Sequence, residues 1–230
     1  MKIGLLIIAT NKYTQFLQPL IESADMFFLR GNEVTYFIFT NQDIEISSAR
    51  EIVKINTEHK EWPWMTLGRY KIFSENSSLL SKMDYLYYCD ADMRFVNHVG
   101  NEILGDIVGT VHPGFFHNPH SSNIALEKRK ESLAFLPPNT IKNYYAGGFN
   151  GGTSKEFLKM SNVISNNIDL DLKEHNIIAE WHDESHMNKY FFHNEPTLQL
   201  SPSYCYPESW NLPFTKKLLA LNKNHNEIRN

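Results

Sequence analysis

Cysteine is scarce in this chain, with Cys89 and Cys205 the only two among 230 residues. So few cysteines exclude the disulfide framework of a small secreted domain, and we expect buried free thiols. Long apolar runs are missing as well. The N-terminal stretch "MKIGLLIIAT" is shorter than the ~20 residues of a membrane span and lacks the small-residue cleavage pattern of a signal peptide. We therefore expect a cytoplasmic protein with no membrane span.

An excess of positive charge is also lacking. Lys and Arg together number 22 against 26 for Asp and Glu, so the formal net charge is −4 at pH 7. A general nucleic-acid binder usually presents a basic face, and we expect no nucleic-acid partner. Hydrophobic residues make up 42% and aromatic residues 13%, which is enough to bury the core of one large domain or two small ones.

The first half of the chain alternates between two kinds of apolar pattern. Continuous apolar runs rich in β-branched and aromatic residues predict strands at Lys2–Ala9, Asn32–Thr40, Ile52–Ile55 and Tyr85–Cys89. Apolar residues at helical spacing predict helices at Tyr13–Phe28 and Leu67–Leu80. Strands that alternate with helices indicate an α/β domain with a mostly parallel sheet.

The amino-acid composition changes after about residue 97. The stretches "GTVHPGFF", "YYAGGFNGG" and "SPSYCYPESWNLPF" are rich in Gly, Pro and aromatic residues, which make turns and carry stacking side chains. Taken by itself, "YYAGGFNGG" predicts a tight hairpin. Helical patterns are present at Ser154–Asn167 and Asn176–Tyr190. We expect a single domain over 1–230, with functional halves at about 1–97 and 98–215 and a mobile C-terminal tail at 216–230.

Two acids follow the predicted strand Tyr85–Cys89, in "YLYYCDADMRF". Ligands of parallel sheets gather at the carboxyl ends of strands, where Asp90 and Asp92 should lie. Alternate residues of an extended chain point the same way, so both carboxylates can face one ligand. Two carboxylates and a diphosphate can together hold Mg²⁺ or Mn²⁺. A solvated acidic turn is the alternative interpretation of these two residues.

A second polar cluster is "EWHDESHMNKY", residues 180–190. His182 and His186 are four residues apart, as in helical zinc sites, but the order of residues is not that of the zincins and no third ligand is apparent. Trp181 beside an Asp-Glu pair suggests a sugar, because an aromatic ring can cover a pyranose while carboxylates bind its hydroxyls. The acids could equally mark the start of a helix.

Taken together, these segments resemble glycosyltransferase family 6, the family of the histo-blood group A and B transferases and of α-1,3-galactosyltransferase. "YLYYCDADMRF", "GTVHPGFF", "YYAGGFNGG", "WHDESHMNKY" and "LSPSYCYPE" occur in the family's order and at compatible spacing over nearly the whole chain. The resemblance implies a GT-A fold, with a Rossmann-like nucleotide-binding half that contains a mixed sheet and an acceptor-binding half. The short bacterial and phage members are the most similar in length.

The resemblance also implies an activity: retaining transfer of Gal or GalNAc from a UDP-sugar to O3 of a β-galactoside, often one that carries α-1,2-fucose. Many bacterial relatives have Asn-x-Asn where this chain keeps Asp90 and Asp92, so we expect dependence on Mn²⁺ or Mg²⁺ held by these two acids. Glu184 matches the proposed nucleophile or electrostatic stabiliser. The small side chains at Ala146 and Gly148 favour GalNAc over Gal.

Other positions carry over from the family's motifs. The resemblance assigns to the donor site Ile8, Ala9, Thr10, Tyr13, Met65, Arg69, Asp90, Ala91, Asp92, Ala146, Gly147, Gly148, Asp183, Lys223 and Arg229. It assigns to the acceptor site His112, Trp181 and Glu208. The segment "IALEKR" departs from the family's usual Thr-Tyr-Glu-Arg-Arg. The competing hypotheses are a metal-dependent hydrolase, a non-catalytic glycan-binding module and, within the family, an α-1,3-galactosyltransferase.

Overall fold

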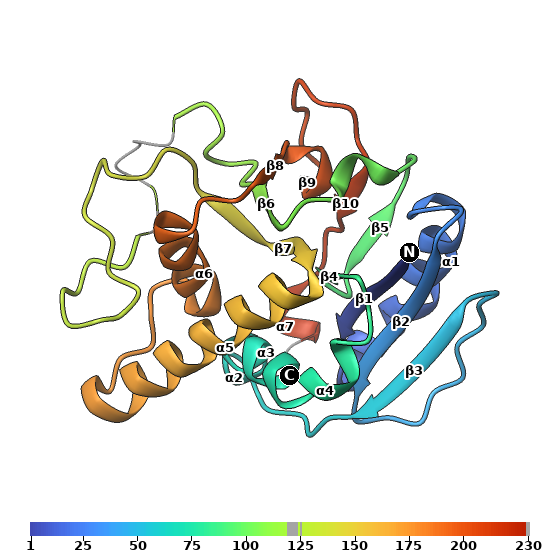
Figure 1. Cartoon of the computed structure of the whole chain (residues 1–230), viewed down its shortest axis with the longest axis horizontal. Helices are drawn as coiled ribbons and strands as arrows, with labels where there is room; N and C mark the ends of the chain where they lie inside the picture. Colours follow the sequence, from blue (N-terminus) through green and yellow to red (C-terminus); the bar gives the residue numbers. More distant parts are fainter. Residues whose placement is uncertain (119–123, 125, 229–230) are drawn as a thin grey trace.

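The computed structural model describes residues 1–118, 124 and 126–228. Within these residues, seven strands form one mixed sheet (Figure 1). From one edge to the other they are β3 (Glu51–Asn56), β2 (Glu33–Thr40), β1 (Lys2–Ile8), β4 (Tyr85–Cys89), β7 (Tyr145–Thr153), β6 (Ile107–Val111) and β8 (Leu198–Leu200). Strands β3, β2, β1 and β4 are parallel, β7 is antiparallel to both neighbours, and β8 is parallel to β6. The predicted α/β class is confirmed.

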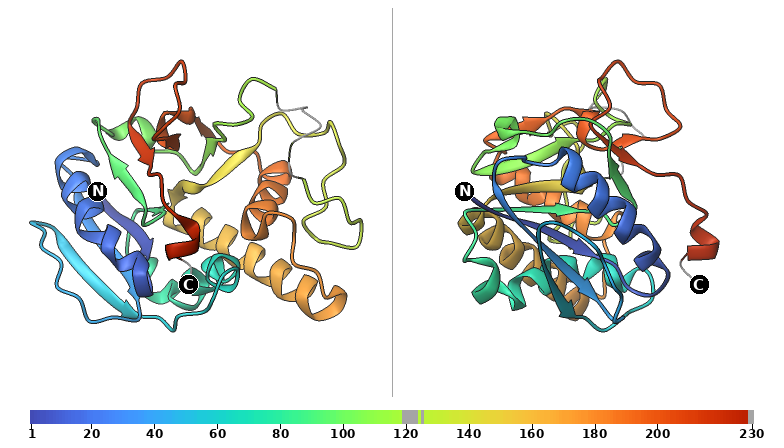
Figure 2. Two further views of the ribbon diagram at one scale, coloured as in Figure 1. Left: turned by 180° about the vertical axis from the view of Figure 1, so that it is seen from behind. Right: turned by 90° about the vertical axis from the view of Figure 1, so that its right-hand side faces the viewer.

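Helices cover both faces of this sheet (Figures 1 and 2). The longer ones are α1 (Leu17–Phe27), α3 (Arg69–Glu75), α5 (Ser154–Leu170) and α6 (His182–His193). The short ones are η1 (Asn11–Phe16), α2 (Trp64–Leu67), α4 (Ser77–Leu80), η2 (Asn101–Ile103), the π-helical turn η3 (Asp171–His175), η4 (Pro202–Tyr204) and α7 (His225–Ile228). No helix within the described residues is both long and apolar enough to cross a membrane.

The strands are apolar on both sides because each face packs against helices. Leu5 and Ile7 of β1 belong to the cluster that contains Leu20 of α1. Leu6, between them, belongs to the opposite cluster with Phe73 of α3. This alternation follows from the period of two in a strand, and the double coverage explains why the sequence of β1 is continuously apolar.

A second sheet of three short strands lies beside β4. Its order is β5 (Met93–Phe95), β10 (Leu218–Ala220) and β9 (Tyr206–Pro207). Strand β5 immediately follows the Asp-x-Asp segment and pairs antiparallel with β10. Part of the predicted tail 216–230 is therefore strand, and Leu221 donates its backbone N–H to the carbonyl of Asp92 at 3.0 Å.

Two predicted helices differ from the structure in continuity or in their first residue. The helix expected at Leu67–Leu80 is divided into α2, α3 and α4. Gly68 separates the first two and Asn76 the last two, and the Asn76 side chain donates to the Ile72 carbonyl at 2.8 Å in competition with the helix ladder. The helix expected at Asn176–Tyr190 begins only at His182, because Asn176 adopts a left-handed φ of 51° that ends η3.

The segment "YYAGGFNGG" is not a hairpin but most of β7, paired on both sides with β4 and β6. Its glycines allow β7 to lie close to the neighbouring strand rather than forming a turn. A Cβ at Gly151 would lie 2.5 Å from the backbone oxygen of Leu86 on the neighbouring strand. Both cysteines are free, as predicted, although Cys205 is only partly buried.

Candidate functional site

The Asp-x-Asp segment lies at the carboxyl end of β4, as predicted. The backbone N–H of Asp90 donates to the Gly148 carbonyl of β7 at 2.9 Å, which continues the β4–β7 ladder by one residue. The Tyr88 hydroxyl donates to Oδ1 of Asp90 at 2.5 Å. Asp92 is buried, and Lys223 forms an ion pair with its carboxylate. Burial and the negative charge of Asp90 raise the pKa of Asp92, and Lys223 opposes the rise.

A cleft of about 1520 Å³ opens at this end of the sheet. The predicted donor residues in its wall are Ile8, Thr10, Tyr13, Met65, Arg69, Asp90, Ala91, Asp92 and Lys223. They meet because β1 and β4 are adjacent parallel strands, so the residues after each strand share one edge. Ala9, also predicted, is fully buried at this edge and donates its N–H to the Phe39 carbonyl of β2 at 2.9 Å.

Arg69, the first residue of α3, connects three parts of the site. Its guanidinium lies 3.5 Å from Oδ1 of Asp90 and 3.2 Å from Oδ2 of Asp183, and its Nη1 donates to the Gly147 carbonyl at 2.8 Å. It also lies over the Tyr88 ring, 4.2 Å from the centroid. Burial would lower the pKa of Arg69, but the surrounding negative charges, Asp183 first, raise it. The group is therefore a fixed, buried cation.

Glu184 is in the first turn of α6, and its Oε2 accepts a 2.7 Å hydrogen bond from the backbone N–H of Gly147. A Cβ at Gly147 would lie 3.2 Å from the same oxygen, so glycine permits this close approach. Burial raises the pKa of Glu184 to about 7, although the Gly147 N–H and the Tyr144 hydroxyl favour its anion. A carboxyl group with a pKa near neutrality beside a cleft is typical of catalytic sites.

Asp183, the residue before Glu184, is 2% exposed and faces Arg69. Burial raises the pKa of Asp183 to about 6, and the charge of Arg69 limits the rise. The two acids therefore meet different partners, Arg69 for Asp183 and the backbone of β7 for Glu184. The Arg69 guanidinium links Asp90, Asp183 and the Gly147 carbonyl, and the N–H of the same glycine binds Glu184.

The predicted acceptor residue His112 follows β6. Its ring stacks on Phe115, with centroids 4.8 Å apart, and meets the edge of Tyr144 at 5.7 Å. The Gly114 N–H donates to Nδ1 of His112 at 3.0 Å, and burial lowers the pKa of His112 to about 4. The imidazole is therefore neutral at pH 7, with its proton on Nε2. Tyr144, which packs against this ring, is also one of the groups that lower the pKa of Glu184.

The other predicted acceptor residues lie farther apart. Trp181 directly precedes α6 and is 52% exposed, so its ring is available for contact with a ligand. Glu208 lies just after β9, where its Oε2 accepts the backbone N–H of Asn222 at 2.9 Å. In this structure, Glu208 ties down the segment that follows β10. Ala146 and Gly148 are on β7, and a Cβ at Gly148 would lie 3.0 Å from Oδ2 of Asp90.

The C-terminal segment lies against the cleft. Lys223 contacts the Asp92 carboxylate and lies 4.9 Å from the centroid of the Tyr13 ring. Lys12 of η1 donates to the backbone carbonyl of Glu227 in α7 at 2.9 Å. Arg229, predicted as a second tail cation for the diphosphate, lies outside the described residues. Lys223 alone of the predicted tail cations can therefore be placed at the cleft.

The side chains of Asp90 and Asp92 suit a hard divalent cation, because both supply carboxylate oxygens to the cleft and Asp90 is 38% exposed there. Across residues 1–118, 124 and 126–228, no group of three His, Cys, Asp or Glu side chains is arranged to hold a metal. A cation at the two aspartates would need further oxygen ligands, which a nucleoside diphosphate can provide. Lys223 occupies part of the same position as a positive counter-charge.

The two histidines considered for zinc have separate partners. The His182 ring packs edge-on against Trp62, with centroids 5.1 Å apart. His186 is buried, with Nε2 3.6 Å from Oδ2 of Asp171. These contacts direct the two rings to different surroundings and give no support to the zinc hydrolase hypothesis.

Three residues at the site were missed by sequence reasoning. The Tyr88 hydroxyl binds Asp90. The Tyr144 ring packs edge-on against His112, and its hydroxyl lowers the pKa of Glu184. Sγ of Cys205 would lie 3.4 Å from a Cβ at Gly148. Tyr88 could have been found, because it lies two residues before Asp90 in a strand and shares its face. Tyr144 and Cys205 reach the site only through long-range packing.

Comparison with known proteins identifies relatives over the whole chain. A family model described as glycosyltransferase family 6 matches residues 1–230. Histo-blood group ABO system transferase 1 of Rattus norvegicus is 35% identical over 240 residues, covering 99% of this chain and 68% of that protein. Globoside alpha-1,3-N-acetylgalactosaminyltransferase 1 of Homo sapiens is 32% identical over 225 residues, covering 94% and 64%.

A bacterial protein is similar in length. O-antigen biosynthesis glycosyltransferase WbnI of Escherichia coli is 30% identical over 226 residues, covering 97% of this chain and 95% of its own. The mixed sheet with helices on both faces is consistent with the GT-A fold expected for such proteins. A full-length family match, these relatives and a cleft lined by the Asp-x-Asp acids agree, and the chain belongs to glycosyltransferase family 6.

Proposed function

We propose that this glycosyltransferase moves GalNAc from UDP-GalNAc, with retention, in α-1,3 linkage to a β-galactoside that carries α-1,2-fucose. The observation that carries the proposal is the position of Arg69, whose guanidinium contacts both Asp90 and Asp183. A nucleotide-side acid and a sugar-side acid are thereby held at a fixed separation. The name of the globoside relative, an alpha-1,3-N-acetylgalactosaminyltransferase, supports GalNAc as the transferred sugar and α-1,3 as the linkage.

The diphosphate of the donor would lie near Asp90, Asp92 and Lys223, with the uridine toward Thr10 and Tyr13 at the end of β1. Lys223 would leave Asp92 and face the diphosphate as negative charge develops on the departing UDP. A divalent cation held by Asp90 and Asp92 would supply further neutralisation of that charge when bound. Closure of the C-terminal segment over the cleft would exclude water, which otherwise hydrolyses the donor.

Glu184 would lie opposite the departing UDP and stabilise the positive charge that develops at the anomeric carbon. The Gly147 N–H fixes the carboxylate at 2.7 Å and prevents rotation away from the sugar. Retention is compatible with a double displacement through Glu184 or with front-side attack beside it, and both routes need the anion at this position. Asp183, held by Arg69, would bind hydroxyls of the donor sugar.

The acceptor galactose would lie between the His112 side of the site and Trp181. The neutral His112 ring can donate from Nε2 to a sugar hydroxyl, because Nδ1 already accepts the Gly114 N–H. The exposed Trp181 ring can cover the apolar face of a pyranose. The small side chain at Ala146 supports GalNAc, because a larger one would take space that the N-acetyl group needs. Gly148 adds no such space in this structure, since a Cβ there would lie 3.0 Å from Oδ2 of Asp90. A preference for UDP-Gal is the alternative.

The test is a UDP-release assay with UDP-GalNAc and UDP-Gal, in Mn²⁺ or EDTA, with lactose and 2′-fucosyllactose as acceptors. We expect the fastest release with UDP-GalNAc, Mn²⁺ and 2′-fucosyllactose. Mass spectrometry and NMR of the product would establish the added sugar and the α-1,3 linkage. Equal rates with both donors would contradict the donor assignment, and acceptor-independent release alone would contradict transfer.

A further inference from the structure

The segment that precedes α6 has little regular structure of its own. Between the end of η3 and the start of α6, residues 176–181 are not helical, and both boundary residues, Asn176 and His182, have left-handed φ values of 51° and 52°. This segment determines where Trp181, Asp183 and Glu184 lie. Its position must therefore be fixed by contacts with the rest of the chain.

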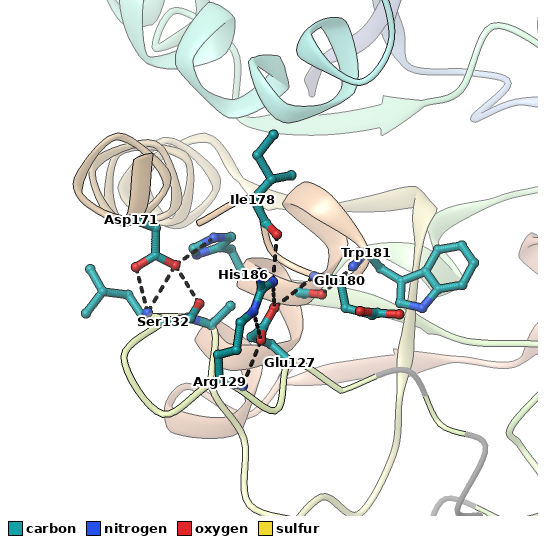
Figure 3. Close-up of polar contacts among 11 residues, drawn as sticks. Glu127, Arg129, Ser132, Asp171, Ile178, Glu180, Trp181 and His186 are labelled. Carbon is teal, nitrogen blue, oxygen red and sulfur yellow. Dashed lines mark hydrogen bonds and ion pairs between the residues drawn. The ribbon is translucent and has the colours of Figure 1, made fainter. Parts of the chain in front are cut away.

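Glu127, in the loop between β6 and β7, makes one of these contacts. Its Oε2 accepts the backbone N–H of Glu180 at 2.9 Å. The same carboxylate accepts from Arg129 through the backbone N–H and Nε at 2.8 Å each and through Nη2 at 2.6 Å. Arg129 in turn donates to the Ile178 carbonyl at 2.7 Å. Figure 3 shows Glu127 between Arg129 and the backbone of Glu180, with Trp181 beyond.

Asp171 makes a second contact between the same loop and the helices. This fully buried carboxylate accepts from the Ser132 hydroxyl at 2.5 Å and from the Leu133 N–H at 2.8 Å. It faces His186 of α6 at 3.6 Å, and burial lowers the pKa of His186 to about 4, so the ring is neutral. The loop 126–133 is thus tied to η3 and α6 as well as to the segment between them (Figure 3).

We infer that Glu127 is a positioning residue: it holds the backbone at Glu180, and through it the placement of Trp181 and Glu184, while contacting neither substrate. The inference rests on the proposed function for the roles of Trp181 and Glu184. Only three residues separate Glu180 from Glu184. A shift of the backbone at Glu180 would therefore also move the Glu184 carboxylate, which accepts the hydrogen bond of the Gly147 N–H.

Burial makes the contact specific to this carboxylate. Glu127 is 2% exposed, so an alanine there would leave the Glu180 N–H without its acceptor and the Arg129 guanidinium without its charge partner. Glutamine would keep one oxygen for the Glu180 N–H but lose the charge. The matched control is Glu131, an exposed carboxylate of the same loop.

The experiment compares Glu127→Ala, Glu127→Gln and Glu131→Ala with the wild type by hydrogen exchange and steady-state kinetics. In Glu127→Ala we expect amide exchange in peptides covering residues 178–187 to accelerate at least about tenfold, with peptides covering β1 and β2 unchanged. We expect the kcat/KM for the acceptor to fall about 100-fold while the Kd for UDP stays the same. Glu127→Gln should lie between alanine and wild type.

Unchanged exchange at residues 178–187 in a folded Glu127→Ala protein would overturn the inference, as would equal effects from Glu131→Ala. A uniform fall in melting temperature and UDP affinity, with no change confined to α6, would show a general structural role and also overturn it. If Glu127→Ala does not fold, the same readouts on Glu127→Gln decide. Exchange needs no substrate, so absence of transfer by the wild type would refute the proposed function and leave this measurement intact.

Discussion

The backbone N–H of Gly147 donates a 2.7 Å hydrogen bond to Oε2 of Glu184, which fixes an acidic side chain of α6 against strand β7. This contact orients the carboxylate before any substrate binds. An arrangement of this kind stabilises developing positive charge without reorganisation during the reaction. The consequence for activity can be measured directly at Glu184.

Replacing Glu184 by Gln should reduce kcat about 100-fold to 1000-fold, because the amide has the same shape but cannot stabilise an oxocarbenium ion by charge. Affinity for UDP, measured by calorimetry, should change little, since Glu184 does not line the nucleotide cleft. Glu174→Gln, on the exposed surface of η3, is the control. Near-normal transfer by Glu184→Gln would refute its catalytic role.

Chelation should abolish transfer. We expect EDTA to lower the rate at least about 100-fold and added Mn²⁺ to restore it, because Asp90 and Asp92 provide the oxygen ligands at the cleft. Asp90→Asn should weaken Mn²⁺-dependent binding of UDP as followed by calorimetry. Undiminished transfer in EDTA would show that Lys223 and other cations suffice without a metal.

The pH dependence of kcat/KM should rise through an apparent pKa of about 7. Burial raises the pKa of Glu184 from its ordinary value of 4.5, so the neutral form dominates below pH 7 and the reactive anion above it. The same shift makes the folded state lose stability as pH rises from about 4.5 to about 7, because the unfolded chain releases this proton first. A rate that is constant between about pH 5.5 and pH 8 would contradict this assignment.

Arg69→Ala should lower the free energy of unfolding as well as the activity. The substitution leaves the buried Asp183 without its cation and removes the hydrogen bond to the Gly147 carbonyl, at a cost of about 3 kcal/mol. Urea denaturation measures this loss. Lys71→Ala, an exposed cation two residues away that pairs with Asp169, should cost less than about 1 kcal/mol. Equal costs for the two variants would show that the Arg69 network adds nothing to stability.

A larger side chain at Ala146 should change the choice of donor. We expect Ala146→Met to lower kcat/KM for UDP-GalNAc relative to UDP-Gal at least about tenfold, because the added atoms take the space of the N-acetyl group. Ala146 is buried, so the melting temperature must be measured in parallel. An unchanged donor ratio in a folded variant would place the N-acetyl group elsewhere.

Strands were predictable where burial leaves a continuous apolar run, as at Tyr85–Cys89, whose bounds agree with β4. Strand β7 was missed because its glycines have the composition of a turn. Their function is close packing against Leu86 and Tyr87, which only the tertiary pairing shows. The prediction of helix ends failed in the same way. The left-handed φ of Asn176 and the break at Gly68 are not visible in the periodicity of apolar residues.

At the site, the pattern of the residues themselves located Asp90 and Asp92, because position after a strand is readable from the chain. The Asp-Glu pair beside Trp181 suggested sugar binding, but the catalytic role of Glu184 and the donor-site role of Arg69 came only from resemblance to a family. An arginine in a short amphipathic helix resembles a surface cation, and its burial results from Asp183 and Gly147, more than 75 residues away. The role of Glu127 was not predicted for the same reason, since its partner Glu180 is 53 residues away.

The antiparallel pairing of β4 with β7 has a mechanical consequence. Strand β4 leads into Asp90, β7 carries the Gly147 N–H that binds Glu184, and the ladder between them continues as far as the Asp90 N–H. Under the proposed function, the residues that bind the nucleotide and the sugar are thus attached to one pair of hydrogen-bonded strands, and a hinge between them would have to break that ladder. Any opening or closing of the site would therefore have to be carried out by segments outside this strand pair. The C-terminal segment that runs from β10 past Lys223 to α7 is one of these.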